Sequence, residues 1–143
     1  MSDCINVLDK ANIAAFVEEW MAAWNRHDLE GVLHGMSDDV VFEHWTGRVV
    51  RGKSLLARVW QPWFAAHGDF RFEIKSLCVD QAEQTFNFEW RLEWPSPESG
   101  HGGQREVREG VDLIQLRDGK VLSKRSYIKT ALNIGNRSIF LKA

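Results

Sequence analysis

The spacing of the apolar side chains changes once along this chain, near Gly68, and this change constrains the fold more than any other feature. Before Gly68 the apolar residues recur every three or four positions, as on one face of a helix; after it they alternate with polar residues, as along a strand. Helical spacing covers residues 13–24, 29–36 and 55–64, and strand-like patterns cover residues 70–75, 86–94, 107–116 and 121–130. This order predicts an α+β fold, with N-terminal helices packed on a curved, mostly antiparallel sheet.

Polar residues between these segments predict where the elements begin and end. Asp9 or Asn12 can cap the first helix, and Asp28 can cap the second, because a side-chain oxygen there accepts a free backbone N–H. Ser37-Asp38-Asp39 is expected to end the second helix. The β-branched and aromatic run from Val40 to Trp45 then predicts a strand.

Size and charge exclude several classes of protein. The 143 residues show no linker and no internal repeat, so residues 1–143 are predicted to form a single domain. A formal net charge of −2 gives no basic field for nucleic acid or an anionic membrane, and no apolar run is long enough to span a bilayer. Cys4 and Cys78 cannot make a disulfide framework, and the first residues show no apolar leader, so a cytoplasmic location is expected.

Motifs for common cofactors are absent from the sequence. There is no phosphate-binding loop, no dinucleotide-binding glycine pattern, no nucleophile elbow and no histidine or cysteine spacing that would hold zinc. We therefore expect no cofactor and no metal.

Seven Trp and eight Phe form the most unusual part of the composition. Helices packed on a curved sheet form a cone that leaves a pocket between them, so some of these rings are expected to line it and the rest to fill the core. Such a pocket favours a flat, small hydrophobic ligand with a few oxygens. The candidate binding residues are Trp20, Trp24, Phe42, Trp60, Phe88 and Ile114.

Asp112 is the first candidate for chemistry. It lies among strand-forming apolar residues, and if Ile114 and Leu116 face the concave side of the sheet, a period of two places Asp112 there too. A carboxyl group in an apolar cleft loses hydration and can serve as a general acid or base near neutral pH. The alternative is an ordinary aspartate, solvent-facing or bonded to neighbouring backbone.

Several segments resemble the NTF2-like, or SnoaL-like, superfamily, and within it ketosteroid isomerase. They are Trp20–Val32, Ser37–His44, Arg51-Gly52 and Val111–Leu116, the last followed by Asp118-Gly119-Lys120-Val121. The resemblance covers roughly residues 10 to 130. It implies a cone-shaped α+β fold and a homodimer.

The isomerase pattern carries over only in part. Its general base, a carboxylate, falls at His44; its tyrosine donor falls at Trp20; and its second carboxyl group falls at Asp112. Only Asp112 is chemically retained, and SnoaL-like cyclases also have an acid–base aspartate at this position. Trp20 offers an N–H that could bind a ligand oxygen but no acidic hydroxyl.

The resemblance places His44 across the pocket from Asp112. We therefore predict that the two form the catalytic proton-transfer pair, with His44 as a base oriented by its carboxylate partner. The alternative is a histidine that is simply part of the core, since His44 shares its strand face with Val40 and Phe42.

Other charged residues are expected to face solvent or a partner. Glu106 and Glu109 interleave with a possible basic stripe, which favours a solvated or dimer face. The stripe comprises Arg105, Arg108, Lys124, Arg125 and Lys129. The lone tyrosine, Tyr127, is expected on the same outer face.

Together these features predict a cofactor-free enzyme that isomerises, cyclises or dehydrates a small hydrophobic carbonyl compound. Two alternatives share the fold. A non-catalytic ligand-binding protein would have an aromatic pocket with Asp112 paired away, and an association module would have a filled cone and an apolar outer sheet.

Overall fold

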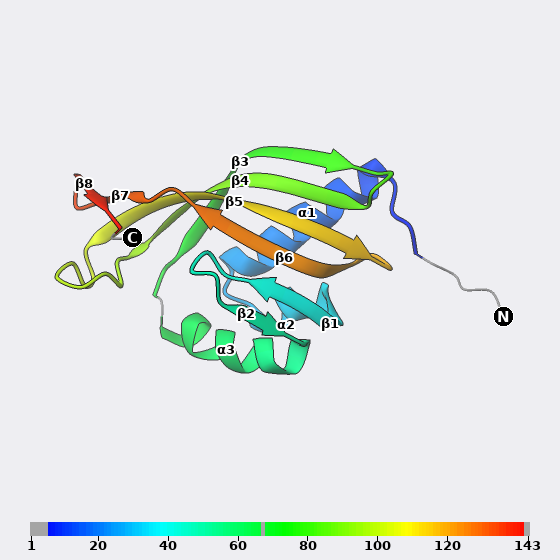
Figure 1. The fold of residues 1–143 in the computed structure, drawn as a ribbon, viewed down its shortest axis with the longest axis horizontal. Coiled ribbons are helices and arrows are strands. Elements are labelled where there is room, and N and C mark those ends of the chain that lie inside the picture. The colour runs from blue at the N-terminus through cyan, green and yellow to red at the C-terminus, as the bar shows by residue number, and fades with distance from the viewer. Residues whose placement is uncertain (1–5, 67, 142–143) are drawn as a thin grey trace.

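The computed structural model describes residues 6–66 and 68–141. The first half holds the helices and two strands: α1 (Lys10–Asn25), α2 (Leu29–His34), β1 (Met36–Glu43), β2 (Val49–Arg51) and α3 (Lys53–Ala66). The second half holds strands: β3 (Arg71–Asp80), β4 (Thr85–Pro95), β5 (Arg105–Arg117), β6 (Lys120–Ile128), β7 (Ala131–Ile134) and β8 (Arg137–Phe140). The predicted succession of helices and long strands is confirmed (Figure 1).

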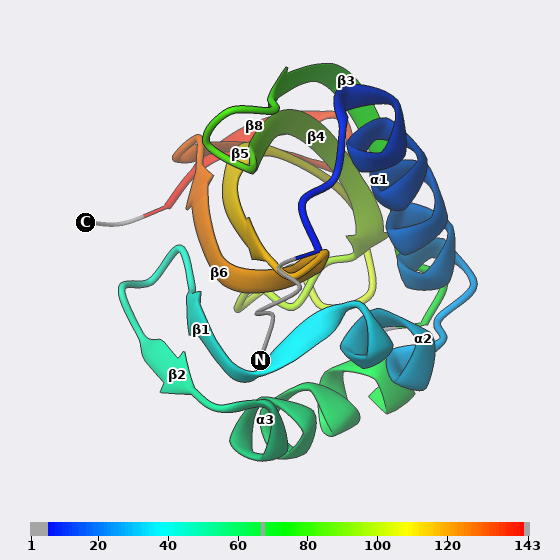
Figure 2. The same cartoon turned by 90° about the vertical axis from the view of Figure 1, so that its right-hand side faces the viewer.

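The strands form one strongly curled sheet in the order β2-β1-β6-β5-β4-β3, with β7 paired to β5 and β8 paired to β7. Only the β1–β6 pairing among the described strands is parallel, so the sheet is mixed but mostly antiparallel. Figure 2 shows the strands curving around the interior, with α1 along the open side and α3 beside β1 and β2. The α+β cone predicted from the sequence is confirmed.

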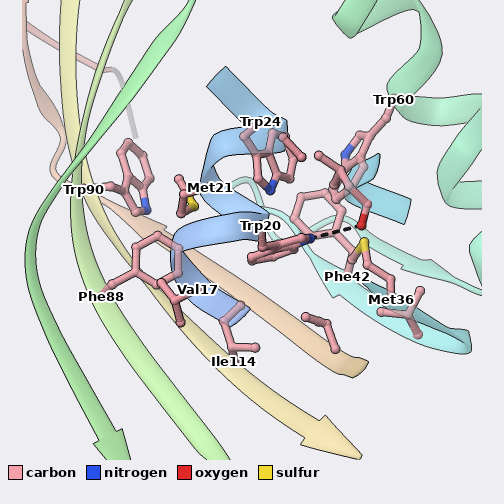
Figure 3. Close-up of a cluster of buried hydrophobic side chains, with 14 of the residues drawn as sticks. Val17, Trp20, Met21, Trp24, Met36, Phe42, Trp60, Phe88, Trp90 and Ile114 are labelled. Atoms are coloured by element: carbon pink, nitrogen blue, oxygen red, sulfur yellow. Dashed lines mark hydrogen bonds between the residues drawn. The ribbon is translucent and has the colours of Figure 1, made fainter. Parts of the chain in front are cut away.

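Helix α1 closes the cone because one of its faces is apolar. The Asp9 side chain accepts the Asn12 N–H at its start, and the Asp28 side chain accepts the Gly31 N–H at the start of α2, so both predicted caps form. The buried residues of α1 are Ile13, Val17, Trp20, Met21, Ala23 and Trp24. They pack against the concave face of the sheet, and Figure 3 shows part of this cluster.

The predicted break at Ser37-Asp38-Asp39 is wrong. Helix α2 ends at His34, and these three residues belong to β1. The Val121 N–H donates to the Gly35 carbonyl, which joins the start of β1 to β6. Met36 and Val41, on either side of the three residues, pair with β6, and the register shifts between these two pairs, so the flanking pairing holds the segment extended despite the local preference of Ser and Asp for turns.

Three other expectations concern Tyr127, the two cysteines and membrane-spanning helices. Tyr127 lies on the outer face of the sheet and is 49% exposed, as predicted, while the homodimer stays a prediction. Cys78 is free and exposed, and Cys4 lies outside the described residues. No helix in the described part of the chain is both long and apolar enough to cross a membrane.

Candidate functional site

A pocket of about 350 Å³ opens between α1, α3, β1 and β6. Its volume is within the range of small-molecule sites. Aromatic and aliphatic side chains form most of its wall: Trp24, Phe42, Trp45, Val50, Val59, Trp60, Trp63 and Phe72. Polar side chains reach it from the β1–β2 turn and from β6: His44, Thr46, Arg48, Lys124 and Ser126.

A buried ion pair lies at the polar side of this pocket. Lys124 Nζ donates to Asp112 Oδ2 and also to Ser126 Oγ at 3.1 Å. The other carboxylate oxygen of Asp112 accepts the Trp90 indole N–H at 3.0 Å. Asp112 is 4% exposed and Lys124 is 8% exposed, and Lys124 rather than Asp112 lines the pocket. The Asp112 carboxylate therefore neutralises and orients the Lys124 ammonium without itself lining the pocket.

Aromatic rings flank the ammonium group of Lys124. Its Nζ lies 5.6 Å from the centre of the Trp24 ring and 5.4 Å from that of Phe42. Ring faces attract a cation, and they also keep water away from it. The site thus combines an apolar wall with one desolvated, hydrogen-bonded positive charge.

The predicted inward position of Asp112 follows the strand period. Asp112 is buried on the same face of β5 as Ile114 and Leu116, with Ser126 as its cross-strand neighbour. The same period of two continues back along β5 to Glu106 and Arg108, which are also buried.

The predicted solvated basic stripe is therefore wrong for two of its members. Arg108 is buried because it lies on the same face of β5 as Asp112, an even number of residues away, and this alternation is visible in the sequence. Lys124 is inside because the pairing of β5 with β6 shifts between Gln115 and Leu116, so the inward phase of β6 changes after Val121. This bulge, which the sequence pattern does not announce, turns Lys124 toward the pocket.

His44 lines the pocket at the end of β1, and its ring orientation is set by Thr46. The Thr46 backbone N–H donates to His44 Nδ1 at 3.2 Å, and Thr46 Oγ1 lies 2.9 Å from the same nitrogen. Because Nδ1 accepts the backbone proton, a neutral ring carries its own proton on Nε2. His44 then presents an N–H donor, rather than a free lone pair, from its other nitrogen.

Burial and nearby positive charge keep the His44 ring neutral. Burial is the largest cause, followed by the charges of Lys124, Arg108 and Arg48, and together they lower the pKa of His44 from 6.5 to about 4. The charge of Asp112 raises this pKa, but by less. His44 is thus uncharged at neutral pH.

Stability should fall in acid because of His44. Between pH 6.5 and about 4, the unfolded chain holds a proton at His44 that the folded chain does not, so the free energy of unfolding decreases as pH falls through this window. Solvent reaches part of the ring, which keeps the total loss below about 2 kcal/mol. Urea unfolding of the wild type and of His44→Gln, at about pH 7 and about pH 4.5, should show a smaller acid loss in the variant. Equal losses would contradict this expectation.

The structure does not join His44 and Asp112 by a hydrogen bond among the described residues. His44 bonds to Thr46, and Asp112 bonds to Trp90 and Lys124. Lys124 is linked to both residues electrostatically, because it pairs with Asp112 and its charge lowers the pKa of His44. Their catalytic roles stay predictions.

The six predicted binding residues are divided between the pocket and the core. Trp24, Phe42 and Trp60 line the pocket. Phe88 and Ile114 are buried in the core and are not among its lining residues. Figure 3 shows the first three near one another, apart from Phe88 and Ile114.

Trp20 lies outside this pocket. Its indole N–H donates to the Val32 carbonyl at 3.0 Å, as the dashed line in Figure 3 marks. This donor, which was predicted to bind a ligand oxygen, therefore already has a partner within the protein. Trp20 instead borders a separate hollow beside α2 and the β5–β6 turn.

A second buried charge cluster supports the rim of the pocket. The Arg108 guanidinium makes two hydrogen bonds, of 3.0 and 3.1 Å, to the fully buried carboxylate of Glu106. The Trp94 indole and the Ser96 hydroxyl donate to the same carboxylate. Arg108 also lies 5.3 Å from the centre of the Trp45 ring, which it holds at the pocket wall.

Metal-binding side chains do not gather anywhere in the described ranges 6–66 and 68–141. No three His, Cys, Asp or Glu side chains there are close enough together to hold an ion. The groups available to a ligand in the pocket are thus nitrogen donors and hydroxyls.

A helix-closed, curled sheet around an aromatic pocket defines the cone-shaped α+β class of the NTF2-like superfamily. The model of the SnoaL-like domain matches residues 17–123, which is more than half of the chain. The chain belongs to the SnoaL-like domain family, and the resemblance inferred from the sequence is confirmed.

Solved structures show the same fold. AclR, described as a candidate hydroxylase of Streptomyces galilaeus, is 25% identical, with a TM-score of 0.69 over 85% of this chain and 81% of that chain. SalBIII, an epoxide hydrolase/cyclase-like enzyme of salinomycin pyran ring formation, is 17% identical, with a TM-score of 0.73 over 85% and 93%. A candidate ketosteroid isomerase of Kribbella flavida is 17% identical, with a TM-score of 0.64 over 83% and 78%. No curated protein matches the chain significantly.

Proposed function

We propose that this protein is an enzyme that binds a small hydrophobic carbonyl compound and isomerises, cyclises or dehydrates it by general acid–base catalysis. The buried Lys124–Asp112 pair at the side of an aromatic pocket is the observation that carries this proposal. Removing two charges from water is costly, and apolar residues would hold the strands together as well. Charged groups kept in a cleft at such a cost are candidates for function.

The reactions in this proposal share one intermediate. Each begins when a proton leaves the carbon beside the carbonyl group, which places negative charge on the carbonyl oxygen. The Lys124 ammonium and the His44 Nε2–H are the two donors that would stabilise this charge in a water-poor site. His44 acts here as a donor rather than as the base predicted from the sequence.

The Lys124–Asp112 pair would also move the proton. When Asp112 holds the shared proton, Lys124 is a neutral amine that faces the ligand and can remove a proton from carbon. The carbon proton makes Lys124 an ammonium, which can deliver that proton to another position of the ligand, and Lys124 then regains the proton that Asp112 held. Asp112 thus acts through Lys124 and does not touch the ligand.

The likeness to solved structures agrees with small-molecule chemistry without selecting one reaction. AclR and SalBIII are described as a candidate hydroxylase and as an epoxide hydrolase/cyclase-like enzyme. Because one fold supports many reactions, the choice among isomerisation, cyclisation and dehydration rests on the pocket and not on these names.

One observation favours a second candidate function, which is ligand binding without catalysis. Asp112 is fully engaged by Lys124 and Trp90, as expected for a carboxylate that only shapes the pocket. The association module receives no such support, because it requires a filled cone and the described residues leave a cavity of about 350 Å³.

Hydrogen–deuterium exchange distinguishes the two candidates. β-Tetralone, a bicyclic aromatic ketone, should exchange the protons beside its carbonyl group faster with the wild-type protein than in buffer, as followed by NMR in D₂O. Lys124→Arg keeps the positive charge beside Asp112 but cannot act as a base at neutral pH, so we expect the enhancement to fall by about 10²-fold or more.

The exposed Lys129 provides the matched control for this experiment. Lys129 pairs with Glu109 on the outside of the sheet, so Lys129→Arg should exchange the ketone as the wild type does. Circular dichroism establishes that each variant is folded. Binding of β-tetralone without faster exchange would overturn the enzymatic proposal in favour of a binding protein.

A further inference from the structure

Lys124 is the one primary amine among the described residues that line the pocket. Its Nζ is buried against the rings of Trp24 and Phe42, and it has two polar partners, the Asp112 carboxylate and the Ser126 hydroxyl. A lysine in such a place has the two features that amine nucleophiles need: little water around it, and a neighbouring base that can remove its proton.

We propose that Lys124 forms a Schiff base with an aldehyde or ketone bound in the pocket, with Asp112 as its proton partner. This inference deepens the proposed function, since it relies on the same carbonyl ligand, but it assigns a covalent step. The aromatic walls select hydrophobic aldehydes and ketones over sugars, because they offer stacking surfaces and few hydrogen-bonding groups.

The step conserves atoms and charge inside the pair. Asp112 first takes one proton from the Lys124 ammonium. The resulting amine attacks the carbonyl carbon to form a carbinolamine, whose oxygen then receives two protons, one from Asp112 and one from the nitrogen, and leaves as water. The product is a protonated imine beside an ionised Asp112. One positive and one negative charge are therefore present before and after the reaction.

This charge balance makes the site suitable for forming a protonated imine on Lys124. A protonated imine keeps the positive charge at the position of the former ammonium, so Asp112 continues to pair with it. The Ser126 oxygen, 3.1 Å from Nζ, can accept the remaining N–H. A protonated imine also withdraws electrons more strongly than a carbonyl group, which would ease removal of the neighbouring proton.

Reductive trapping tests the proposal. The folded protein is incubated with limiting naphthaldehyde and sodium cyanoborohydride, whose hydride reduces the C=N bond to a stable secondary amine. We expect one adduct by intact mass and its location on the peptide that contains Lys124. Lys124→Arg should lower trapping by more than about tenfold, because arginine forms no imine under these conditions.

Lys129→Arg serves as the control, because Lys129 lies on the outer face of the sheet and pairs with Glu109. It should be trapped like the wild type. Asp112→Asn should slow trapping, since an amide cannot take the ammonium proton. Adducts confined to exposed lysines, at the rate seen for free lysine, would overturn the proposal, and peptide mapping of the wild type gives this answer even if Lys124→Arg does not fold.

The exchange experiment separates this proposal from the proposed function. Faster exchange of β-tetralone protons without any trapped adduct would leave acid–base catalysis standing and remove the covalent step. An adduct on Lys124 without faster exchange would support the imine and contradict the acid–base enzyme.

Discussion

Replacement of Glu106 by glutamine should lower the free energy of unfolding by about 3–5 kcal/mol. The substitution keeps the shape of the side chain but removes its charge, so the buried Arg108 guanidinium loses its nearest counterion and keeps only the partly exposed Glu98 carboxylate, 3.6 Å away, while it remains between the Trp45 and Trp94 rings. Removing one partner of a buried, hydrogen-bonded ion pair is among the most destabilising single changes in a folded protein. Urea denaturation of the wild type and Glu106→Gln measures the difference.

An exposed ion pair supplies the matched control for Glu106→Gln. Asp39 accepts two hydrogen bonds from Arg117, at 2.7 and 2.8 Å, with both side chains more than half exposed. Asp39→Asn should therefore lower the free energy of unfolding far less than Glu106→Gln does. If Glu106→Gln costs no more than this control, the Glu106–Arg108 pair is not desolvated as the structure describes. The double variant Glu106→Leu/Arg108→Met should recover much of the loss, because it leaves no buried charge.

The second large effect is expected at the pocket itself. Lys124→Met should lower the free energy of unfolding by about 3–5 kcal/mol, because it leaves the Asp112 carboxylate buried without its cation. The methionine fills a similar volume and can pack against Trp24 and Phe42, so lost packing contributes little. Thermal and urea unfolding of the variant provide the measurement.

Two further variants assign the cause of this loss. Lys124→Arg should be much milder than Lys124→Met, since it retains a cation for Asp112. Lys129→Met removes an exposed lysine that pairs with Glu109 at 3.5 Å, and it should change stability by less than about 1 kcal/mol. Equal costs for Lys124→Met and Lys129→Met would show that the Lys124–Asp112 pair is effectively hydrated, and they would weaken the functional argument built on its burial.

Local patterns in the sequence were sufficient for most of the architecture. The caps at Asp9 and Asp28 form because each side-chain oxygen accepts a free backbone N–H only three residues further along the chain, so the interaction is local. The inward position of Asp112 follows from strand alternation, which is also local. The family resemblance, carried by short segments in a fixed order, agrees with the match to the SnoaL-like domain over residues 17–123.

The same local rules misplaced residues whose position depends on a partner strand. Ser37-Asp38-Asp39 lies within β1, in the stretch between Met36 and Val41 where the register with β6 shifts, whereas its composition favours a turn. Lys124 faces the pocket because of the shift between β5 and β6, and nothing in the β6 sequence specifies that shift. Glu106 and Arg108 looked like interleaved surface charges, although the phase of β5 already placed them with Asp112.

The sequence by itself determined the fold class, the element order and the face on which Asp112 lies, because helix and strand periods and caps depend on neighbours along the chain. Only the tertiary structure decided what surrounds Asp112. The register of β6 brings Lys124 to it, and the packing of α1 against α2 gives the Trp20 N–H to Val32. These contacts join residues from separate elements, so they depend on register and packing that no single segment encodes.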